Sequence, residues 1–362
     1  MPKRRVSSAE TRPQNPLTMK AKRLLLLLTL FSVMLNAFCA RSAARRCVPA
    51  AEVQIYAMGV TNFRVEALNI DPLLAARPFP VAPASRKESK ALAEQWRSDF
   101  APALVPVGAA DAYAARRALN AAVGLWVQTG LSDYAEAVET LLFNGLTAAL
   151  RYPRDPIERH VAASALLDGV GAAFGSDDEA VYVNYYIGSG AHVCDAKRDL
   201  RLDVLTALPA DGRVRVRVRG MAANGTRECL RLRLPSWAGA CPVVRVNGRE
   251  TDVRLVRGYI EIDRRWNNGD EVFFELPLTP RVICADGRAA ILLGPMAYAC
   301  PAGMTDVLFL TDDPLRLDDI EGSDLYAVVV RAISAEGNDK PFEVALLPYA
   351  LTRSEVWLPA SR

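Results

Sequence analysis

The sequence predicts an α+β protein in which helices come first and antiparallel β-sandwich units follow. Alanine is abundant before about residue 175, whereas valine, arginine and leucine dominate after it. Apolar residues recur at helical spacing between residues 111 and 176, and from Ala180 they alternate with polar residues at a period of two. Short strands separated by regular turns then indicate sandwiches.

The overall composition excludes several classes of function. The chain has 362 residues, enough for two or three domains, and its formal net charge is only +3. Such a small charge does not draw a protein onto nucleic acid, so we expect no nucleic-acid partner. His160 and His192 are the only histidines, which excludes metal and catalytic motifs that need more.

The N-terminal segment has the pattern of a secretory signal. Lys20, Lys22 and Arg23 precede an apolar run over residues 24–35, and small residues follow. The run is shorter than the roughly 20 residues of a membrane span, so no transmembrane helix is expected. Cys39 suggests a lipoprotein, but Phe38 before it does not suit a lipobox. We therefore expect a signal region over residues 1–45 and a secreted or periplasmic protein.

Residues 46–107 are linker-like and have no predicted domain. Residues 53–58 read as one strand, and the Pro-rich stretch 76–83 reads as a linker or surface loop. Ser85 is expected to cap a helix that runs to about Phe100, with Glu88 three residues later as in a capping box.

Residues 108–179 are predicted to be helical. Ser132 is the expected N-cap of one helix, and a second helix is expected from about Val161 to Phe174. The first helix carries one apolar stripe formed by Val138, Leu141, Leu142, Leu146 and Ala149. Glu136 and Glu139 fall away from that stripe. Paired carboxylates suggest acid–base chemistry, but we expect a solvated helix face.

Residues 180–285 are predicted to form the middle β-sandwich. A strand is expected over residues 181–187, and in residues 213–219 the valines should face the core and the arginines the solvent. The arginine stripe suits either an anionic ligand or a solvated face. Asn247-Gly248 and Asn268-Gly269 are expected to close two hairpins. Local pairing of this kind predicts a separable folding unit that starts at about Ala180.

Residues 286–362 are predicted to form a smaller C-terminal β-unit. The acidic segment 312–319 is a candidate calcium loop, although it lacks the fixed ligand spacing of known loops. Apart from Cys39, the cysteines are widely scattered and contain no C-x-x-C, which leaves one or two disulfides or buried free thiols open. These are Cys47, Cys194, Cys229, Cys241, Cys284 and Cys300.

Three stretches, in this order, resemble glycoside hydrolase family 127, the bacterial β-L-arabinofuranosidases. Residues 134–145 are similar to the family's helix that ends in Tyr/Phe-Asn-Gly. Residues 181–189 are similar to the strand that opens the family's middle sandwich. The third and longest set comprises residues 232–238, 246–248, 257–260, 265–270 and 291–295, and the tail over residues 347–358 also resembles the family.

The resemblance implies the C-terminal part of an (α/α) barrel followed by β-sandwich domains. It also implies a zinc site of cysteines and a glutamate, in which a zinc-bound cysteine is the nucleophile and another glutamate is the general acid/base. The family's Glu-Thr-Cys motif would fall at residues 111–120, which contain neither glutamate nor cysteine. Its paired cysteines would fall between Tyr152 and Val161, where Asp155, Glu158 and His160 offer only a weak alternative metal site. No catalytic, cofactor or metal residue is therefore carried over.

Three functional hypotheses follow. The first is an exported, truncated or degenerate relative of these glycosidases in carbohydrate metabolism that does not hydrolyse β-L-arabinofuranosides and carries no stoichiometric zinc. The second is a non-catalytic binder of an arabinose-containing or related glycan, with Trp237, Tyr259 and Trp266 as candidate stacking residues, although core packing also explains them. The third is an active glycosidase with a rebuilt site. The oligomeric state is left open.

Overall fold

A computed structural model describes residues 47–50, 52–57, 86–100, 111–195, 197–220, 225–285, 287–304, 307–335 and 340–361. The predicted signal region, the Pro-rich stretch and Ser85 lie outside these residues. Residues 45–362 form one compact unit. No described helix combines the length and the apolar character that crossing a membrane requires.

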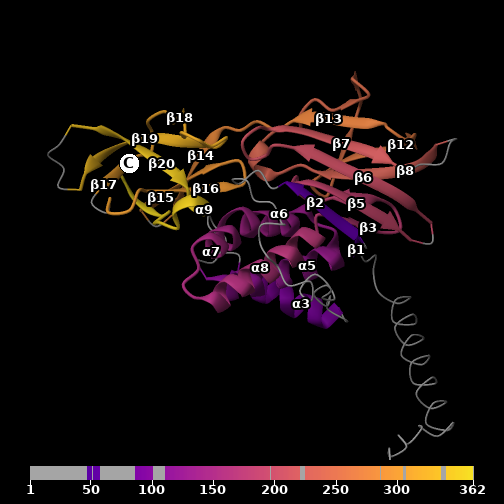
Figure 1. Ribbon diagram of the computed structural model, residues 1–362, viewed down its shortest axis with the longest axis horizontal. Helices are drawn as coiled ribbons and strands as arrows, with labels where there is room; N and C mark the ends of the chain where they lie inside the picture. The colour runs from indigo at the N-terminus through magenta and orange to yellow at the C-terminus, as the bar shows by residue number, and fades with distance from the viewer. Residues whose placement is uncertain are drawn as a thin grey trace, which may run out of the picture. The chain divides into compact units, whose positions relative to one another are not determined.

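The helices lie mostly in the first half of the chain, as predicted. They are α3 (Arg86–Gln95), α5 (Ala112–Thr129), α6 (Ser132–Leu141), α7 (Thr147–Arg151), α8 (Pro156–Gly171) and α9 (Tyr349–Thr352), with π-turns η2 (Trp96–Phe100) and η3 (Leu142–Leu146) and the 3₁₀ turn η4 (Ser236–Ala238). The predicted helix up to Phe100 is confirmed over α3 and η2. Figure 1 shows the helices of residues 112–171 gathered together beneath the strands.

Two helix starts differ from the prediction. Ser132 is the first residue of α6 and Leu131 is its N-cap, and the Ser132 N–H donates to the Arg257 carbonyl of a neighbouring turn at 3.3 Å. The helix α8 begins at Pro156, well before Val161. Asp155 caps it by accepting the Glu158 N–H at 2.7 Å, and proline suits the first turn. Phe174, where this helix was expected to end, lies in a strand.

Two sheets form the middle sandwich. The first runs in the order β1 (Val48–Pro49), β3 (Phe174–Ser176), β4 (Val181–Val183), β8 (Thr226–Arg233), β12 (Tyr259–Trp266) and β11 (Arg254–Val256). The second runs β10 (Arg249–Glu250), β9 (Arg245–Val246), β13 (Glu271–Glu275), β7 (Arg213–Arg219), β6 (Asp199–Thr206), β5 (Gly188–Cys194) and β2 (Glu52–Ala57). All pairs are antiparallel except β4 with β8. The predicted strand over residues 181–187 therefore ends at Val183.

The stretch without a predicted domain contributes a strand to each of these sheets. The strand β1 pairs with β3 and completes the edge of the first sheet. The expected strand near residue 53 is confirmed as β2, which pairs with β5 at the edge of the second sheet. Met58 lies outside the described residues. The sandwich is thus built from segments that precede and follow the helices in the sequence.

Only one of the two predicted hairpins is present. Asn247 and Gly248 have positive φ angles of 51° and 78° and join β9 to β10, as expected of an Asn-Gly turn. The Asn268-Gly269 turn instead connects β12 in the first sheet to β13 in the second. It crosses between sheets because the Gly269 N–H donates to the Val218 carbonyl of β7 at 2.8 Å.

A third sheet holds the C-terminal residues. Its order is β14 (Pro280–Ala285), β15 (Arg288–Leu293), β16 (Met296–Ala299), β20 (Phe342–Pro348), β19 (Tyr326–Ser334), β17 (Val307–Leu310) and β21 (Leu358–Ser361), with β18 (Arg316–Asp319) beside β19. Since β21 also pairs with β15, the last strand returns beside the second. The sheet begins at β14, before the expected boundary at residue 286.

One hydrophobic core runs through helices and sheets. It includes Trp126 of α5, Leu142 after α6, Tyr182 of β4, Leu232 of β8 and Val216 of β7, all nearly or fully buried. The helices pack against the first sheet, where Trp126 of α5 donates to Tyr259 of β12 and Glu139 of α6 pairs with Arg233 of β8. The core of the strands from about Ala180 is completed by the preceding helices and by β1 and β2, which argues against the expectation that these strands fold as a separable unit.

Candidate functional site

Glu136 and Glu139 of α6 do not lie on a solvated helix face, which corrects the prediction. Glu139 is fully buried, and both carboxylates pair with the fully buried Arg233 of β8, at 3.2 Å for Glu136 and 2.5 Å for Glu139. Burial raises the pKa of Glu139, and the charge of Arg233 opposes that rise. Two carboxylates on one arginine fasten the helix to the sheet. They are not placed on opposite sides of a space that could hold a sugar, as the two carboxylates of a glycosidase are.

The surroundings of this ion pair supply further donors. The backbone N–H of Ser236 donates to Glu136 at 2.8 Å, and Trp237 Nε1 donates to Glu139 at 3.3 Å. The Tyr186 hydroxyl donates to the Arg233 carbonyl. In β8, Leu230 and Leu232 alternate with Arg231 and Arg233, so the sequence places Arg233 on the face opposite the leucines, but it does not reveal the helix that covers that face.

The aromatic residues considered for glycan stacking belong mainly to the core. Tyr259 and Trp266 are fully buried, and Trp237 is half-buried. The Tyr259 hydroxyl accepts from Trp126 Nε1 at 3.0 Å and donates to Asn184 at 2.7 Å. A ring with both faces packed cannot stack on a sugar, so Tyr259 and Trp266 are excluded as stacking residues.

Asp155, Glu158 and His160 do not converge on a metal position. Asp155 caps α8, and the buried Glu158 pairs with Arg353 at 2.7 Å and accepts the Arg154 N–H at 2.6 Å. Burial would raise the pKa of Glu158, but the hydrogen bonds from Arg353 and Arg154 lower it to about 2. His160 is exposed. The sequence of these residues is that of a helix start, with an acidic N-cap, a proline and a glutamate at the third position.

The acidic segment 312–319 does not converge either. Asp313 pairs with Arg331 at 2.9 Å, while Asp318 lies in β18 and pairs with Arg316. The six cysteines that the structure describes are all free thiols, so none of the possible disulfides forms among them.

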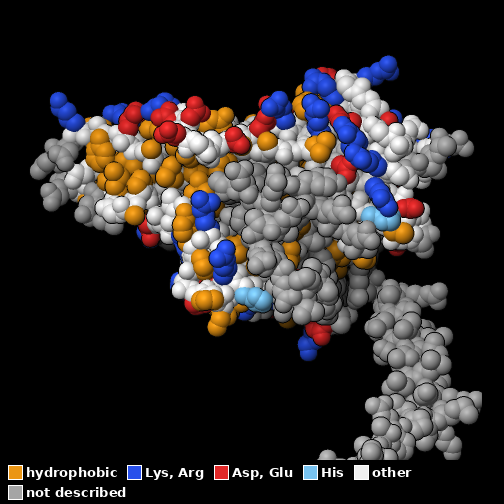
Figure 2. All heavy atoms as spheres, viewed as in Figure 1, with side chains coloured by type: hydrophobic (Ala, Val, Ile, Leu, Met, Phe, Trp, Pro, Cys, Tyr) orange, Lys and Arg blue, Asp and Glu red, His pale blue; other side chains and the backbone are white. Residues whose placement is uncertain are grey.

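The arginines of β7 face solvent and its valines are buried, as predicted. Figure 2 shows Lys and Arg side chains in a row on the visible face, ending beside a histidine. Arg217 pairs with Glu271 at 3.0 Å, and Arg219 pairs with Asp203 at 2.5 Å. Because carboxylates neutralise much of the stripe, the interpretation as a solvated strand face is favoured over an anion site.

A polar cleft lies at one end of the middle sandwich, between β1 and the loop that joins β5 to β6. Its volume is about 330 Å³. Its polar lining comes from Ser176, Asp177, Asp178, Asp195, Lys197 and Arg198. Val48, Pro49, Ala50 and Val193 supply an apolar side. A volume of this size accommodates a small ligand with many hydroxyl groups.

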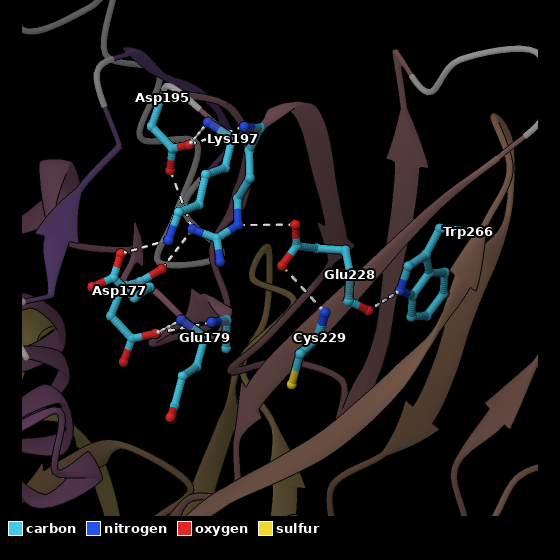
Figure 3. A network of polar contacts seen from close by, with 10 residues as sticks. Asp177, Glu179, Asp195, Lys197, Glu228, Cys229 and Trp266 are labelled. Atoms are coloured by element: carbon cyan, nitrogen blue, oxygen red, sulfur yellow. Dashed lines mark hydrogen bonds and ion pairs between the residues drawn. The ribbon is translucent and has the colours of Figure 1, made fainter.

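Arg198 organises this cleft through three contacts. Its guanidinium donates to Glu228 at 2.9 Å, to the Asp177 carbonyl at 2.5 Å and to Asp195 at 3.2 Å. Figure 3 shows the side chains of Asp195 and Glu228 in this network, and Lys197 bonded to an aspartate beside them, which is Asp178 at 2.8 Å. Burial acts to raise the pKa of Asp195, but hydrogen bonds from the Lys197 and Arg198 backbone and from the Arg198 side chain lower it.

His192, Cys194 and Asp199 lie on the same hairpin, and Cys194 also lines the cleft. His192 Nε2 is 2.7 Å from Asp199 Oδ1, and one ligand atom of each residue lies within 4.8 Å of the other two. Among the described residues, this is the one such group that contains a histidine or a cysteine. The sequence did not predict this group. Two residues at i and i+2 share a strand face, which was the available signal, but Asp199 joins them only through the strand pairing.

Comparison with known proteins gives the fold a family context. Residues 180–278 match the family model described as the middle domain of the GH127 beta-L-arabinofuranosidases. The chain resembles glycoside hydrolase family 127. This confirms the resemblance inferred from the sequence motifs, and the matched segment begins where the middle sandwich was expected to begin.

Solved GH127 structures share the architecture over a larger part of the chain. One GH127 beta-arabinofuranosidase is 21% identical with a TM-score of 0.61, over 69% of this chain and 49% of that one. A GH127 beta-L-arabinofuranosidase from Geobacillus stearothermophilus T6 is 20% identical with a TM-score of 0.59, over 70% and 50%. At such identities the likeness shows the fold alone. The chain spans about half the length of these structures. No curated protein matches the sequence.

The residues at the positions expected for GH127 zinc ligands do not fit a thiolate–zinc centre. Residues 112–120 form the start of α5, where Ala112, Ala115 and Leu119 are buried in the core. Asp111 caps that helix by accepting the Tyr113 N–H at 2.7 Å. At the second expected position, Asp155 and Glu158 are bound to backbone N–H groups and to Arg353.

The thiols for which a pKa shift is resolved favour the protonated state. Burial raises the pKa of Cys47 to about 12 and that of Cys229 to about 12. Burial also raises the pKa of Cys241 and of Cys300. A thiol acts as a nucleophile through its thiolate, so none of these four resembles the activated cysteine of a GH127 enzyme.

Proposed function

We propose that this protein is an exported, GH127-like protein of carbohydrate metabolism in which hydrolysis by a zinc-bound cysteine is impaired. The architecture supports the carbohydrate context, since both a family model and solved glycosidases match it. The observation that carries the impairment is the use of Asp111, Asp155 and Glu158 as structural caps and ion-pair partners, at the positions where the resemblance would place catalytic ligands.

A hydrolysis assay tests this proposal directly. The full chain is incubated with an aryl β-L-arabinofuranoside, with and without added zinc and with a chelator. We expect no release of the aryl group above the uncatalysed rate in any condition. Release that a chelator abolishes would overturn the proposal, because it would show metal-dependent hydrolysis, which the residues at the expected zinc-ligand positions do not support.

The export part of the proposal rests on the basic and apolar pattern of residues 20–40. N-terminal sequencing of the secreted protein should find a start between about Ala40 and Arg46. Full-length chain retained in the cytoplasm would contradict export without affecting the assay above.

A second candidate function is non-catalytic glycan binding in the polar cleft. The cleft offers fixed acceptors on Asp177 and Asp195 and the donors of Lys197 and Arg198, and its apolar side can cover one face of a sugar. Its charged groups are already oriented by their mutual hydrogen bonds, which lowers the cost of ordering them around a ligand.

Calorimetry with L-arabinose-containing oligosaccharides tests this candidate. We expect Asp178→Ala and Lys197→Ala at the rim to weaken binding about tenfold or more, as hydrogen bonds to charged groups contribute about 1.5–3 kcal/mol. The variant Arg316→Ala, on β18 of the third sheet, is the control and should bind like the unaltered protein. Absence of binding would reject this function and leave the first proposal standing.

A further inference from the structure

The hairpin of β5 and β6 places three metal-ligating side chains on one face. His192 and Cys194 stand two residues apart on β5, and Asp199 is directly opposite Cys194 in the antiparallel register. Alternation along a strand sends both β5 side chains to the same face, and cross-strand pairs lie about 4.5–5.5 Å apart at Cβ. The neighbours Val193 and Leu200 point the other way and are buried.

The loop between the two strands is fixed by its own hydrogen bonds. The Asp195 N–H donates to the Arg198 carbonyl at 2.9 Å, and the Asp195 carboxylate accepts the backbone N–H groups of Lys197 and Arg198 at 2.8 and 2.9 Å. Cys194 and Asp199 flank this loop, so their separation is set by the fold rather than by chance rotation of a flexible segment.

The three donor atoms already lie near the spacing of a metal site. His192 Nε2 and Asp199 Oδ1 are 2.7 Å apart, and all three donors lie within 4.8 Å of one another. In a tetrahedral zinc site, bonds of about 2.0–2.3 Å hold ligand atoms about 3.3–3.8 Å apart. Side-chain rotations can bring the donors to that spacing, because Cys194 and Asp199 are exposed.

Two of the cations beside the hairpin are already paired with carboxylates. Arg198 is paired with Glu228 and Asp195, and Lys197 is paired with Asp178. Arg201, opposite His192 in the register, and Arg219, opposite Arg201, add positive charge nearby, and Arg219 is paired with Asp203.

We propose that His192, Cys194 and Asp199 bind a divalent cation of the zinc type, with water in the fourth position. The donor set is one imidazole, one thiolate and one carboxylate, which suits Zn²⁺ better than Mg²⁺ or Ca²⁺. The site lies on the sandwich, not at the helix positions where the resemblance implies zinc, and it replaces the expectation that the protein carries none. It is independent of the proposed function.

Titration of the full chain with Zn²⁺ and Co²⁺ alone tests the site. Zinc affinity is measured by competition with a chromogenic chelator, and Co²⁺ reports a thiolate ligand through its sulfur-to-metal absorption band. We expect one ion per chain and a Cys194-dependent band. His192→Gln, Cys194→Ser and Asp199→Asn should each lower the affinity at least tenfold, and Cys194→Ser should remove the band.

Cys284→Ser is the matched control, since Cys284 is also an exposed thiol but lies on β14 of the third sheet. It should leave affinity and spectrum unchanged. Circular dichroism confirms that each variant is folded. Unchanged zinc affinity in all three ligand variants, or a cobalt band that survives Cys194→Ser, would overturn the assignment.

Discussion

Arg233 is a fully buried cation held by two carboxylates of a helix that lies far from it in the sequence. Replacing it with methionine leaves the buried Glu139 without its counter-charge. Breaking a buried pair in this way costs about 3–5 kcal/mol. We expect Arg233→Met to lower the free energy of unfolding by that amount, measured by urea denaturation.

The control for this prediction lies on the same strand. Arg227 of β8 pairs with Asp263 at 2.9 Å, but its side chain is 73% exposed. An exposed pair contributes about 0–1 kcal/mol, so Arg227→Met should change stability little. If both variants lost the same amount, burial of the Arg233 pair would not be the source of its contribution.

Glu158 predicts a pH-dependent contribution to stability. Its pKa is lowered to about 2 in the folded protein from an ordinary value near 4.5. A carboxyl whose pKa is lowered by folding stabilises the fold at pH values above its pKa in the unfolded chain. This stabilisation is lost as the pH falls toward its pKa in the folded protein. We expect Glu158→Gln to be less stable than the unaltered protein at pH 7, with a gap that shrinks between about pH 4.5 and pH 2.

Glu355→Gln serves as the comparison for Glu158. Glu355 pairs with Arg288 at 2.9 Å, and both side chains are about half exposed. The difference in stability between Glu355→Gln and the unaltered protein should be small both at pH 7 and near pH 2. A Glu158→Gln gap that stays constant down to pH 2 would mean that the lost contribution is packing, not charge.

At the level of elements, Gly258 joins β11 to β12 where a helix approaches closely. Its φ is +81°, and a Cβ there would lie 1.8 Å from Ser132 Oγ of α6. We expect Gly258→Ala to destabilise the protein by more than the roughly 1–2 kcal/mol of left-handed backbone strain, because helix and sheet must also separate. Thermal denaturation measures the loss.

Gly248 is the natural control for that substitution. Its φ is +78°, but a Cβ there would meet nothing within 4 Å. Gly248→Ala should therefore cost only the backbone strain. Equal losses at the two glycines would show that the contact with Ser132 has no consequence for stability.

The same turns show what the sequence could and could not predict. An Asn-Gly pair favours a tight turn, and the hairpin predicted at Asn247 is present. It does not determine whether the next strand joins the same sheet, which at Gly269 depends on the distant Val218 carbonyl. The hairpin at Arg257-Gly258 was not predicted. Arg257 has a φ of 53° there because β11 and β12 pair on either side of it, and that pairing is not visible in the local sequence.

The candidate sites differ from the predictions for a related reason. Periodicity identified the polar side of α6 but not that a sheet bearing Arg233 covers it, so Glu139 was expected in solvent. Likewise, the spacing of His192 and Cys194 was visible, while Asp199 reaches them only through pairing of β5 with β6. Helical and stranded segments follow from local pattern, whereas these sites depend on contacts between segments.

For the whole molecule, the continuous core predicts that the strands cannot be excised. A fragment of residues 180–362 lacks β1, β2 and the helices that cover Arg233 and Tyr259. We expect this fragment to aggregate or to lack a cooperative melting transition by circular dichroism. A fragment of residues 45–362, the full compact unit, should melt cooperatively. Cooperative melting of the shorter fragment would contradict the shared core.

The position of β2 has a consequence for how the chain assembles. Ile55 pairs with Ser189, so a strand synthesised early waits for a partner synthesised much later. Once β5 has been synthesised, it presents an open sheet edge until β2 docks, and another strand can fill that edge. In concentrated refolding mixtures, β2 of one molecule can dock on β5 of another, giving exchanged dimers that dilute refolding avoids. Size-exclusion chromatography after refolding at two concentrations would show whether the exchanged dimer forms at the higher concentration and the monomer at the lower one.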